Sequence, residues 1–129
     1  MSTRASSHSA PFSMDALVLD AEAEVERIAA TMRRQLRTDL RRRGLVLGVS
    51  GGIDSSVCAA LAVRAVGPER VLAIMMPEND SDPESQTLGE QLIAHLGIAG
   101  VLEDIGPTLD DMDCYRSRDE AIRTLVPAF

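Results

Sequence analysis

The sequence has 129 residues, of which 45% are hydrophobic, and this length and composition predict one folded domain with a single core. A net charge of −7, aromatic residues at only 2% and no tryptophan argue against a nucleic-acid-binding surface, because such surfaces need clustered cations or stacking aromatic rings. No apolar stretch approaches the roughly 20 residues of a membrane span, and two well-separated cysteines, Cys58 and Cys114, fit a reduced, cytoplasmic compartment.

The first part of the chain divides into a polar tail and a long amphipathic helix. Residues 1–13 are small and polar without periodicity, which predicts a disordered tail ahead of one α/β domain over residues 14–129. From about Asp15 to Arg42 apolar residues recur every three or four positions, as on one helix face, and Gly44 is expected to end this helix. Its acidic first half and arginine-rich second half complement the helix dipole. We interpret the arginines as a solvated face rather than a nucleic-acid site, and contact with the phosphates of a bound nucleotide stays open.

The stretch that follows contains the strongest local signal in the sequence. Residues 45–49 are apolar and rich in branched side chains, which predicts a strand buried on both faces in the middle of a parallel sheet. Residues 50–52, Ser-Gly-Gly, interrupt the apolar run, and helical spacing of apolar residues then continues until Gly67. The predicted order is therefore buried strand, glycine loop and helix.

This order predicts a phosphate cradle. Glycines let backbone N–H groups approach an anion closely, and the amino end of the following helix favours negative charge. The Walker A loop is excluded because the sequence contains no lysine, and the glycines do not have the spacing of the dinucleotide fingerprint. The alternative is a plain glycine turn with Asp54 or Ser55 as an ordinary N-cap.

A second predicted strand at residues 71–75 places another loop beside this cradle. A strand–helix–strand unit implies a right-handed crossover to a parallel neighbour. The loops at Ser50 and Pro77 then both lie beyond the carboxyl ends of strands, where open α/β sheets bind ligands. Backbone groups near Met75 are therefore candidate partners for an adenine ring.

The rest of the chain predicts a helix, a short strand and a last helix. Asp82 and Pro83 suit the N-cap and the first position of a helix that Gly97 closes. Residues 101–104 predict the third strand and residues 116–125 the last helix.

Three further features favour structural over catalytic roles. Cys58 lies among alanines and is interpreted as a small core hydrophobe, and His95 as a structural or solvated side chain. The acidic run of Asp110, Asp111 and Asp113 is interpreted as a solvated face near a turn rather than as a metal site.

Two motifs connect the sequence to a known family. Residues 50–55 read S-G-G-I-D-S and resemble the S-G-G-x-D-S PP-loop of the ATP pyrophosphatase superfamily at every fixed position. Residues 76–85 read M-P-E-N-D-S-D-P-E-S and look like the M-P-E-x-D-S-x-P-E-S segment of a branch of NAD synthetases, as do residues 105–110 and 114–123. GMP synthetases share the first motif, but the second disfavours them. The resemblance covers about residues 15–129.

The resemblance implies a three-layer α/β/α fold with a parallel sheet, of the adenine nucleotide alpha hydrolase-like class. It implies ATP and Mg²⁺ as bound groups, with Asp54 as the Mg²⁺ ligand and no protein nucleophile. The residues implied to hold the ATP phosphates are Gly48, Val49, Ser50, Gly51, Gly52, Ile53, Asp54 and Ser55.

The implied reaction is amide ligation: ATP adenylates the nicotinate carboxylate of deamido-NAD, pyrophosphate leaves, and ammonia displaces AMP to give NAD. NAD synthetases continue well beyond this length, so we expect the chain to correspond to the N-terminal part of such a domain. The implied partners are a second copy in a homodimer or a complementing C-terminal half. The alternatives are an ATP- and Mg²⁺-binding fragment without turnover, half of a split enzyme, and another PP-loop ligase.

Overall fold

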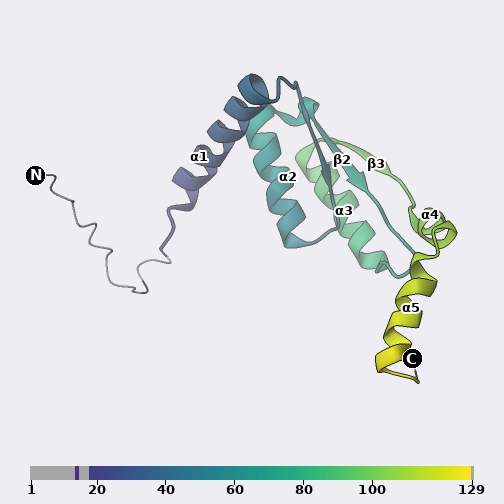
Figure 1. Cartoon of the computed structure of the whole chain (residues 1–129). Helices are drawn as coiled ribbons and strands as arrows, with labels where there is room; N and C mark the ends of the chain where they lie inside the picture. Colours follow the sequence, from purple (N-terminus) through teal and green to yellow (C-terminus); the bar gives the residue numbers. More distant parts are fainter. Residues whose placement is uncertain (1–13, 15–17, 129) are drawn as a thin grey trace, which may run out of the picture.

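A parallel three-stranded sheet is the centre of the computed structural model, which describes residue 14 and residues 18–128 (Figure 1). The tail predicted over residues 1–13 lies outside the described residues. The strands, in the spatial order β1-β2-β3, are β1 Leu45–Gly48, β2 Val71–Met75 and β3 Ala99–Leu102. The α-helices of the described part are α1 Ala21–Arg34, α2 Ile53–Val66, α3 Pro83–Leu96, α4 Gly106–Asp111 and α5 Cys114–Leu125. No helix in this part of the chain is both long and apolar enough to span a membrane.

The register of the sheet brings the loops that follow the strands to one edge. Leu45 pairs with Val71, and Leu72 pairs with Ala99. Pairing continues past the carboxyl ends of the strands, where Val49 N–H donates to the Ile74 carbonyl at 2.9 Å. The parallel arrangement and the meeting of the two loops at this edge are confirmed.

The core lies on one face of the sheet. Val71, Ala73 and Met75 point to this face and are buried against the alanine-rich side of α2. α3 contacts the same face, because a Cβ on Gly100 of β3 would meet the Ile93 side chain at 3.0 Å. Two right-handed crossovers in one direction place α2 and α3 on the same side.

The opposite face of the sheet is not covered by any described helix. Val46 is 63% exposed and Val101 is 43% exposed on that face. α1 packs against α2 from outside and does not cover it (Figure 1). The described residues therefore form a parallel sheet with apolar side chains on both faces, and their helices cover only one of these faces. The strand predicted at the centre, β1, pairs with β2 alone in this part of the chain, and β2 is the central strand.

The first helix is shorter than the sequence predicts at both ends. Asp20 caps it, since its carboxylate accepts the Ala23 N–H at 3.1 Å, so α1 starts at Ala21. After α1 the chain makes a π-helical turn over Gln35–Asp39 and then turns at Arg41, whose φ is 52°. Gly44 does not end the helix. It lies against the turn before β2, where a Cβ would approach the Arg70 carbonyl oxygen to 2.7 Å.

The sequence predicts the limits of α3 correctly, but it predicts the elements after α3 less accurately. Asp82 caps α3 by accepting the Glu84 N–H at 2.9 Å, Pro83 is its first residue, and Gly97 ends it with a φ of 64°. The third strand begins two residues earlier than predicted. The sequence also did not predict α4, and α5 begins at Cys114 rather than at Arg116.

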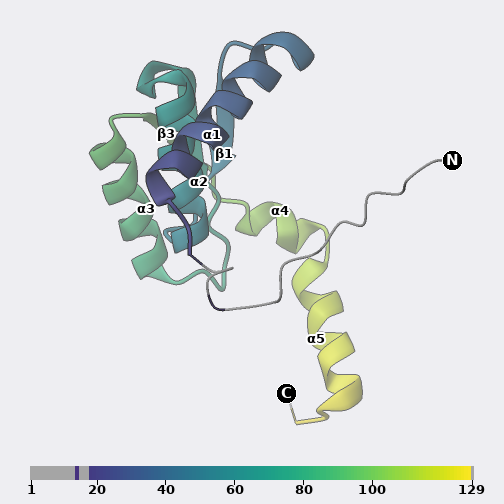
Figure 2. The same cartoon turned by 90° about the vertical axis from the view of Figure 1, so that its left-hand side faces the viewer.

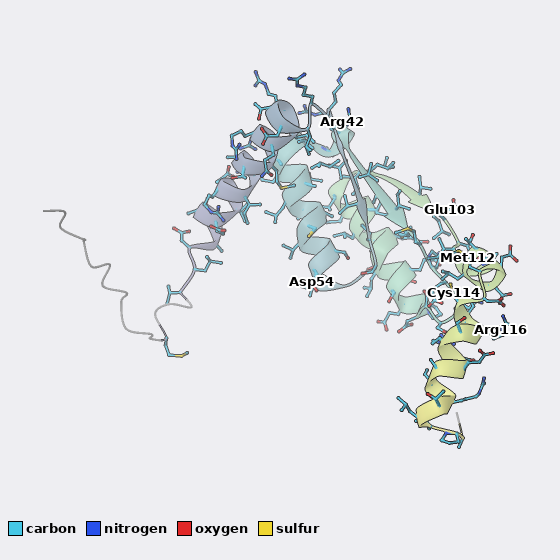
Figure 3. All side chains as sticks on the ribbon, in the orientation of Figure 1. Arg42, Asp54, Glu103, Met112, Cys114 and Arg116 are labelled. Atoms are coloured by element: carbon cyan, nitrogen blue, oxygen red, sulfur yellow. The ribbon has the colours of Figure 1, made fainter. Side chains whose placement is uncertain are left out.

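The arginines at residues 41–43 lie at the end of the molecule opposite to the glycine loop, as Arg42 and Asp54 show in Figure 3. Arg33 donates to the Arg64 carbonyl at 3.2 Å, and Arg70 donates to the Val66 carbonyl at 2.7 Å, so both satisfy carbonyls at the carboxyl end of α2. Since β1 separates Arg41–Arg43 from the loop at Ser50, these arginines do not reach a phosphate held there.

Ala29 is the buried residue of α1 and sets how closely α1 approaches α2. We expect Ala29→Leu to lower the free energy of unfolding by about 1–3 kcal/mol, because the added volume would force the two helices apart. Ala30→Leu makes the same change at an exposed neighbouring position and should stay within about 0.5 kcal/mol. Urea unfolding followed by circular dichroism measures both, and equal losses would contradict this packing.

Candidate functional site

A cavity of about 730 Å³ opens at the carboxyl edge of the sheet, between the glycine loop, the loop after β2 and the end of β3. Small-molecule sites usually have about 300–1,000 Å³. The residues that line it are Gly48, Val49, Ser50, Met75, Met76, Pro77, Glu78, Asn79, Ser81, Asp82, Pro83, Ser85, Gln86, Leu102 and Asp104. This is the position that parallel sheets use for ligands.

The glycine loop between β1 and α2 is shaped by backbone conformation and by serine hydroxyls. Gly51 has a φ of 77°, and a Cβ there would collide with the Ser85 carbonyl oxygen of α3. The Ser55 hydroxyl donates to the Gly52 carbonyl at 3.0 Å and accepts the Ser50 N–H at 3.3 Å. The Ser56 hydroxyl donates to the same carbonyl at 2.8 Å. The loop is therefore closed on itself and packed against the first turn of α3.

The amino end of α2 has the features of an anion site. Its N-cap is Gly52, which has no side chain, and no described side chain caps the helix. The alternative of an ordinary cap by Asp54 or Ser55 is therefore wrong. The first-turn N–H groups and the helix dipole remain directed at the loop, which favours a phosphate.

The eight residues predicted to hold ATP phosphates divide into two groups. Gly48, Val49 and Ser50 line the cavity, whereas residues 51–55 form the rest of the loop and the first turn of α2, outside the lining. Asp54 is exposed at the start of α2 (Figure 3). Within residues 14 and 18–128, no three His, Cys, Asp or Glu side chains come together as a metal cluster. Binding of Mg²⁺ by Asp54 stays a prediction.

Sequence reasoning missed most of the second wall of the cavity. The loop at Pro77 lies at the predicted edge and Met75 lines the cavity, while contact of its backbone with an adenine ring stays a prediction. The side chains of the loop after Pro77 were not predicted as site residues. Asp104 was missed as well. The sequence pattern placed it inside the third strand, whereas it lies just beyond the carboxyl end of β3, as Ser50 lies beyond that of β1.

The cavity has acidic and hydroxyl side chains, and none of the described residues that line it is basic. Its carboxylates already have partners. Asp82 caps α3, and Asp104 Oδ1 accepts the Gly106 N–H at 2.9 Å. Glu78 accepts the hydroxyl of Tyr115 at 2.9 Å.

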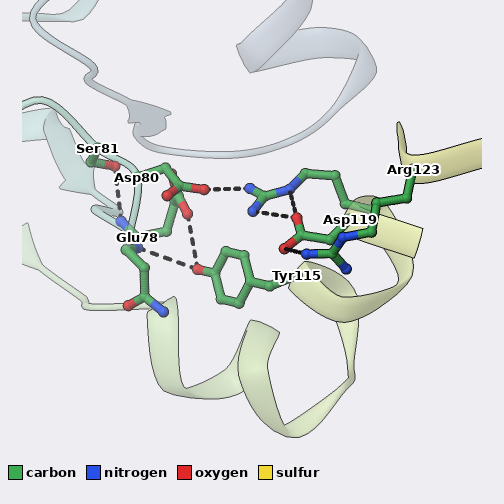
Figure 4. Close-up of polar contacts among 8 residues, drawn as sticks. Glu78, Asp80, Ser81, Tyr115, Asp119 and Arg123 are labelled. Atoms are coloured by element: carbon green, nitrogen blue, oxygen red, sulfur yellow. Dashed lines mark hydrogen bonds and ion pairs between the residues drawn. The ribbon is translucent and has the colours of Figure 1, made fainter. Parts of the chain in front are cut away.

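Tyr115 of α5 connects that helix to the outer side of the loop after β2 (Figure 4). Its hydroxyl also accepts the Asn79 N–H at 3.2 Å. Partial burial raises the pKa of Tyr115 above its ordinary value. The Asn79 N–H opposes this increase, and the carboxylates of Glu78 and Asp80 raise the pKa further. The phenol is therefore neutral at physiological pH and donates to Glu78.

The side chains assigned structural roles are all at least partly exposed. His95 is exposed, as is the acidic run at residues 110, 111 and 113, which agrees with solvated positions. Cys58 is exposed on α2, so its assignment to the core is wrong, because it lies on the side of the helix that no described element covers. Neither cysteine lines the cavity, and Cys114 is the first residue of α5 (Figure 3).

Comparison with known proteins shows the family. The parallel α/β fold and the S-G-G-I-D-S motif define the chain as a domain of the PP-loop fold. The family model described as NAD synthase matches residues 24–125, so the chain belongs to the NAD synthase family.

Similar relatives carry the name NH(3)-dependent NAD(+) synthetase. The protein from Rhizobium rhizogenes (strain K84) is 57% identical over 122 residues, which are 95% of this chain and 36% of the relative. That from Rhizobium meliloti (strain 1021) is 60% identical over 118 residues, 92% of this chain and 35% of the relative. The chain therefore spans about a third of the length of these relatives.

Solved structures of the same family share the fold. NH3-dependent NAD synthetase from Campylobacter jejuni, in complex with nitrate, is 30% identical with a TM-score of 0.67 over 73% of this chain and 40% of that chain. Glutamine-dependent NAD+ synthetase from Acinetobacter baumannii, in complex with ADP, is 28% identical with a TM-score of 0.68 over 76% of this chain and 19% of that chain.

The close approach at Gly51 predicts an unequal effect of the same substitution at two glycines. Gly97→Ala places an alanine at a positive φ with no atom within 4 Å, so its cost is backbone strain alone, about 1–2 kcal/mol. Gly51→Ala adds the collision with Ser85 and should lower the free energy of unfolding by more than Gly97→Ala does. Urea unfolding of both variants gives the difference. Equal values would mean that the glycine loop does not pack on α3 as described.

Proposed function

We propose that the chain forms the ATP-binding part of an ammonia-dependent NAD synthetase, which amidates deamido-NAD. The observation that carries this proposal is the amino end of α2, which has no side-chain cap and faces a glycine loop at the rim of a cavity. Membership of the NAD synthase family supports the choice of reaction. The ADP in the Acinetobacter baumannii structure supports an adenine nucleotide as the ligand.

The proposed reaction has two steps. In the first, a carboxylate oxygen of deamido-NAD attacks the α-phosphorus of ATP, and the bond to the β-phosphate breaks to release pyrophosphate. In the second, ammonia attacks the acyl carbon, AMP leaves, and the nitrogen loses a proton to give the amide of NAD. Because no protein nucleophile is needed, the chain contributes position and charge stabilisation.

Residues 48–55 would hold the phosphates by different means. Gly51 and Gly52 would let backbone N–H groups approach the phosphate oxygens, while the hydroxyls of Ser50 and Ser55 maintain the loop. Val49 is buried and anchors the loop to the core, and Ile53 begins the helix whose dipole faces the phosphates.

The charge of the cavity supports a requirement for Mg²⁺. Among the described lining residues there are carboxylates and no arginine, and the chain contains no lysine. Asp54 would hold the ion together with phosphate oxygens, the ligand set that Mg²⁺ uses with nucleotides. When bound, Mg²⁺ neutralises phosphate charge and stabilises pyrophosphate as it leaves.

The proposal also includes substrates and protein partners. Deamido-NAD and ammonia are the substrates, and a second copy or a complementing C-terminal half would supply what the longer relatives contain beyond this segment. The free cysteines, Cys58 and Cys114, support a reducing, cytoplasmic location.

Synthesis of NAD by the purified chain tests the proposal. ATP, Mg²⁺, deamido-NAD and ammonium are supplied, with and without a C-terminal segment of the Rhizobium meliloti relative, and NAD, AMP and pyrophosphate are quantified. We expect the three products in equal amounts when the site is complete. Binding of ATP without turnover in both mixtures would leave a nucleotide-binding module, and no binding of ATP would contradict the proposal.

Replacement of Asp54 tests the assignment of the metal ligand. Asp54→Ala should weaken binding of ATP in the presence of Mg²⁺ by at least about tenfold, because the carboxylate that holds the ion is lost. It should leave the free energy of unfolding nearly unchanged, since Asp54 is exposed. Glu69→Ala is the matched control, because it removes another exposed carboxylate, at the opposite end of the sheet. Calorimetric titrations that give both variants the wild-type dependence on Mg²⁺ would remove Asp54 from the site.

A further inference from the structure

α5 is attached to the rest of the molecule by polar contacts rather than by a buried apolar face. None of its described residues is buried, and the helix projects away from the sheet in both views (Figures 1 and 2). It contacts α4, and it reaches the loop after β2 through Tyr115 and Arg118. A helix without a buried face keeps a fixed orientation only through contacts of this kind.

The loop that these side chains contact is a wall of the cavity. We define the cavity loop as residues 78–82, and all of these residues except Asp80 line the cavity. Asp80 faces the other way and forms an ion pair with Arg118 of α5. The cavity loop therefore has one side on the candidate nucleotide site and the other side on α5.

Tyr115 holds the same loop at two points. Its hydroxyl donates to Glu78 Oε2 at 2.9 Å and accepts the backbone N–H of Asn79 at 3.2 Å (Figure 4). The guanidinium of Arg118 lies 5.4 Å from the centre of the Tyr115 ring, so the two side chains support each other. Asp119 accepts from Arg118 at 2.9 Å and fixes its direction.

We propose that Tyr115 and Arg118 are positioning residues for the nucleotide cavity: they fix the cavity loop from its outer side, so that docking of α5 and occupancy of the cavity stabilise each other. The proposal rests on the proposed function, because it assigns ATP to the cavity. The coupling is reciprocal, as any coupling between two binding equilibria must be.

The contacts between α5 and the cavity loop act as a network, and no single one of them would fix the loop. An exposed ion pair contributes little by itself, and Arg118 and Asp80 are 46% and 58% exposed. Tyr115 is half-buried, and its hydroxyl satisfies a carboxylate and a backbone N–H together. Removal of the hydroxyl would release both groups at the cavity wall.

Tyr115→Phe is the first test, since it removes the hydroxyl and keeps the ring below Arg118. We expect binding of ATP with Mg²⁺ to weaken about three- to tenfold, because part of the population would have a misplaced cavity loop. The free energy of unfolding should change little, as α5 buries no residue. Isothermal calorimetry and urea unfolding measure the two quantities.

A matched pair of arginines on α5 separates positioning from general electrostatics. Arg118 contacts the cavity loop, whereas Arg116 pairs with Asp113 alone among the contacts described (Figure 3). Both substitutions by alanine remove one positive charge from the same helix, so a long-range effect on ATP would be equal in the two variants. We expect Arg118→Ala to weaken binding and Arg116→Ala to leave it at the wild-type value.

Exchange of the two charges supplies a rescue. Arg118→Asp should weaken binding of ATP, and the added change Asp80→Arg should restore most of it, because Asp80 does not line the cavity. Wild-type affinity in both Tyr115→Phe and Arg118→Ala, or equal losses in Arg116→Ala and Arg118→Ala, would overturn the proposal.

Hydrogen exchange distinguishes failure of this inference from failure of the proposed function. Without nucleotide, the Asn79 amide should exchange at least about tenfold faster in Tyr115→Phe than in the wild type, since its acceptor is lost. With ATP and Mg²⁺, the amides of α5 should exchange more slowly in the wild type. A wild-type protein that binds no ATP would contradict the proposed function. In that case the exchange rate of the Asn79 amide without nucleotide still tests whether Tyr115 fixes the cavity loop. An unchanged Asn79 amide would overturn that role.

Discussion

The parallel pairing of β1 with β2 is the constraint on which the candidate site depends. Because the strands run in the same direction, the glycine loop after β1 and the cavity loop after β2 reach the same edge of the sheet. Gly51 then lets the first loop contact Ser85, at the start of α3, without a side chain between them. One register thus brings the glycine loop next to a segment that lies much later in the sequence, the cavity loop with the start of α3, and the cavity lies between them.

Local sequence signals predicted the elements whose ends are fixed by local interactions. The limits of α3 follow from Asp82, Pro83 and Gly97, each of which acts within a few residues of its own position. The glycine loop was predicted for the same reason. The first helix was predicted too long, because periodicity alone does not show that Asp20 caps it or that Arg41 rather than Gly44 makes the turn.

Features determined by contacts between distant segments could not be predicted from the sequence. Tyr115 lies 36 residues after Asn79. No sequence spacing predicts that a tyrosine on α5 contacts the loop that follows β2. The exposure of Cys58 depends on which side of α2 faces the core, and its alanine neighbours give no clear periodicity. Asp104 required the register of β3, which decides where that strand ends.

The distribution of charge is compatible with the phosphate site proposed at the carboxyl edge of the sheet, although the chain has a net charge of −7. The two ends of α2 have different polar environments. At its carboxyl end, Arg33 and Arg70 satisfy the last carbonyls, while at its amino end the N–H groups remain available beside Gly52. Because the described lining of the cavity contains no basic side chain, the proposed attraction for a phosphate would come from backbone geometry and from the dipole of α2. The conformation of the glycine loop, rather than the overall charge of the chain, therefore determines the chemistry of this edge.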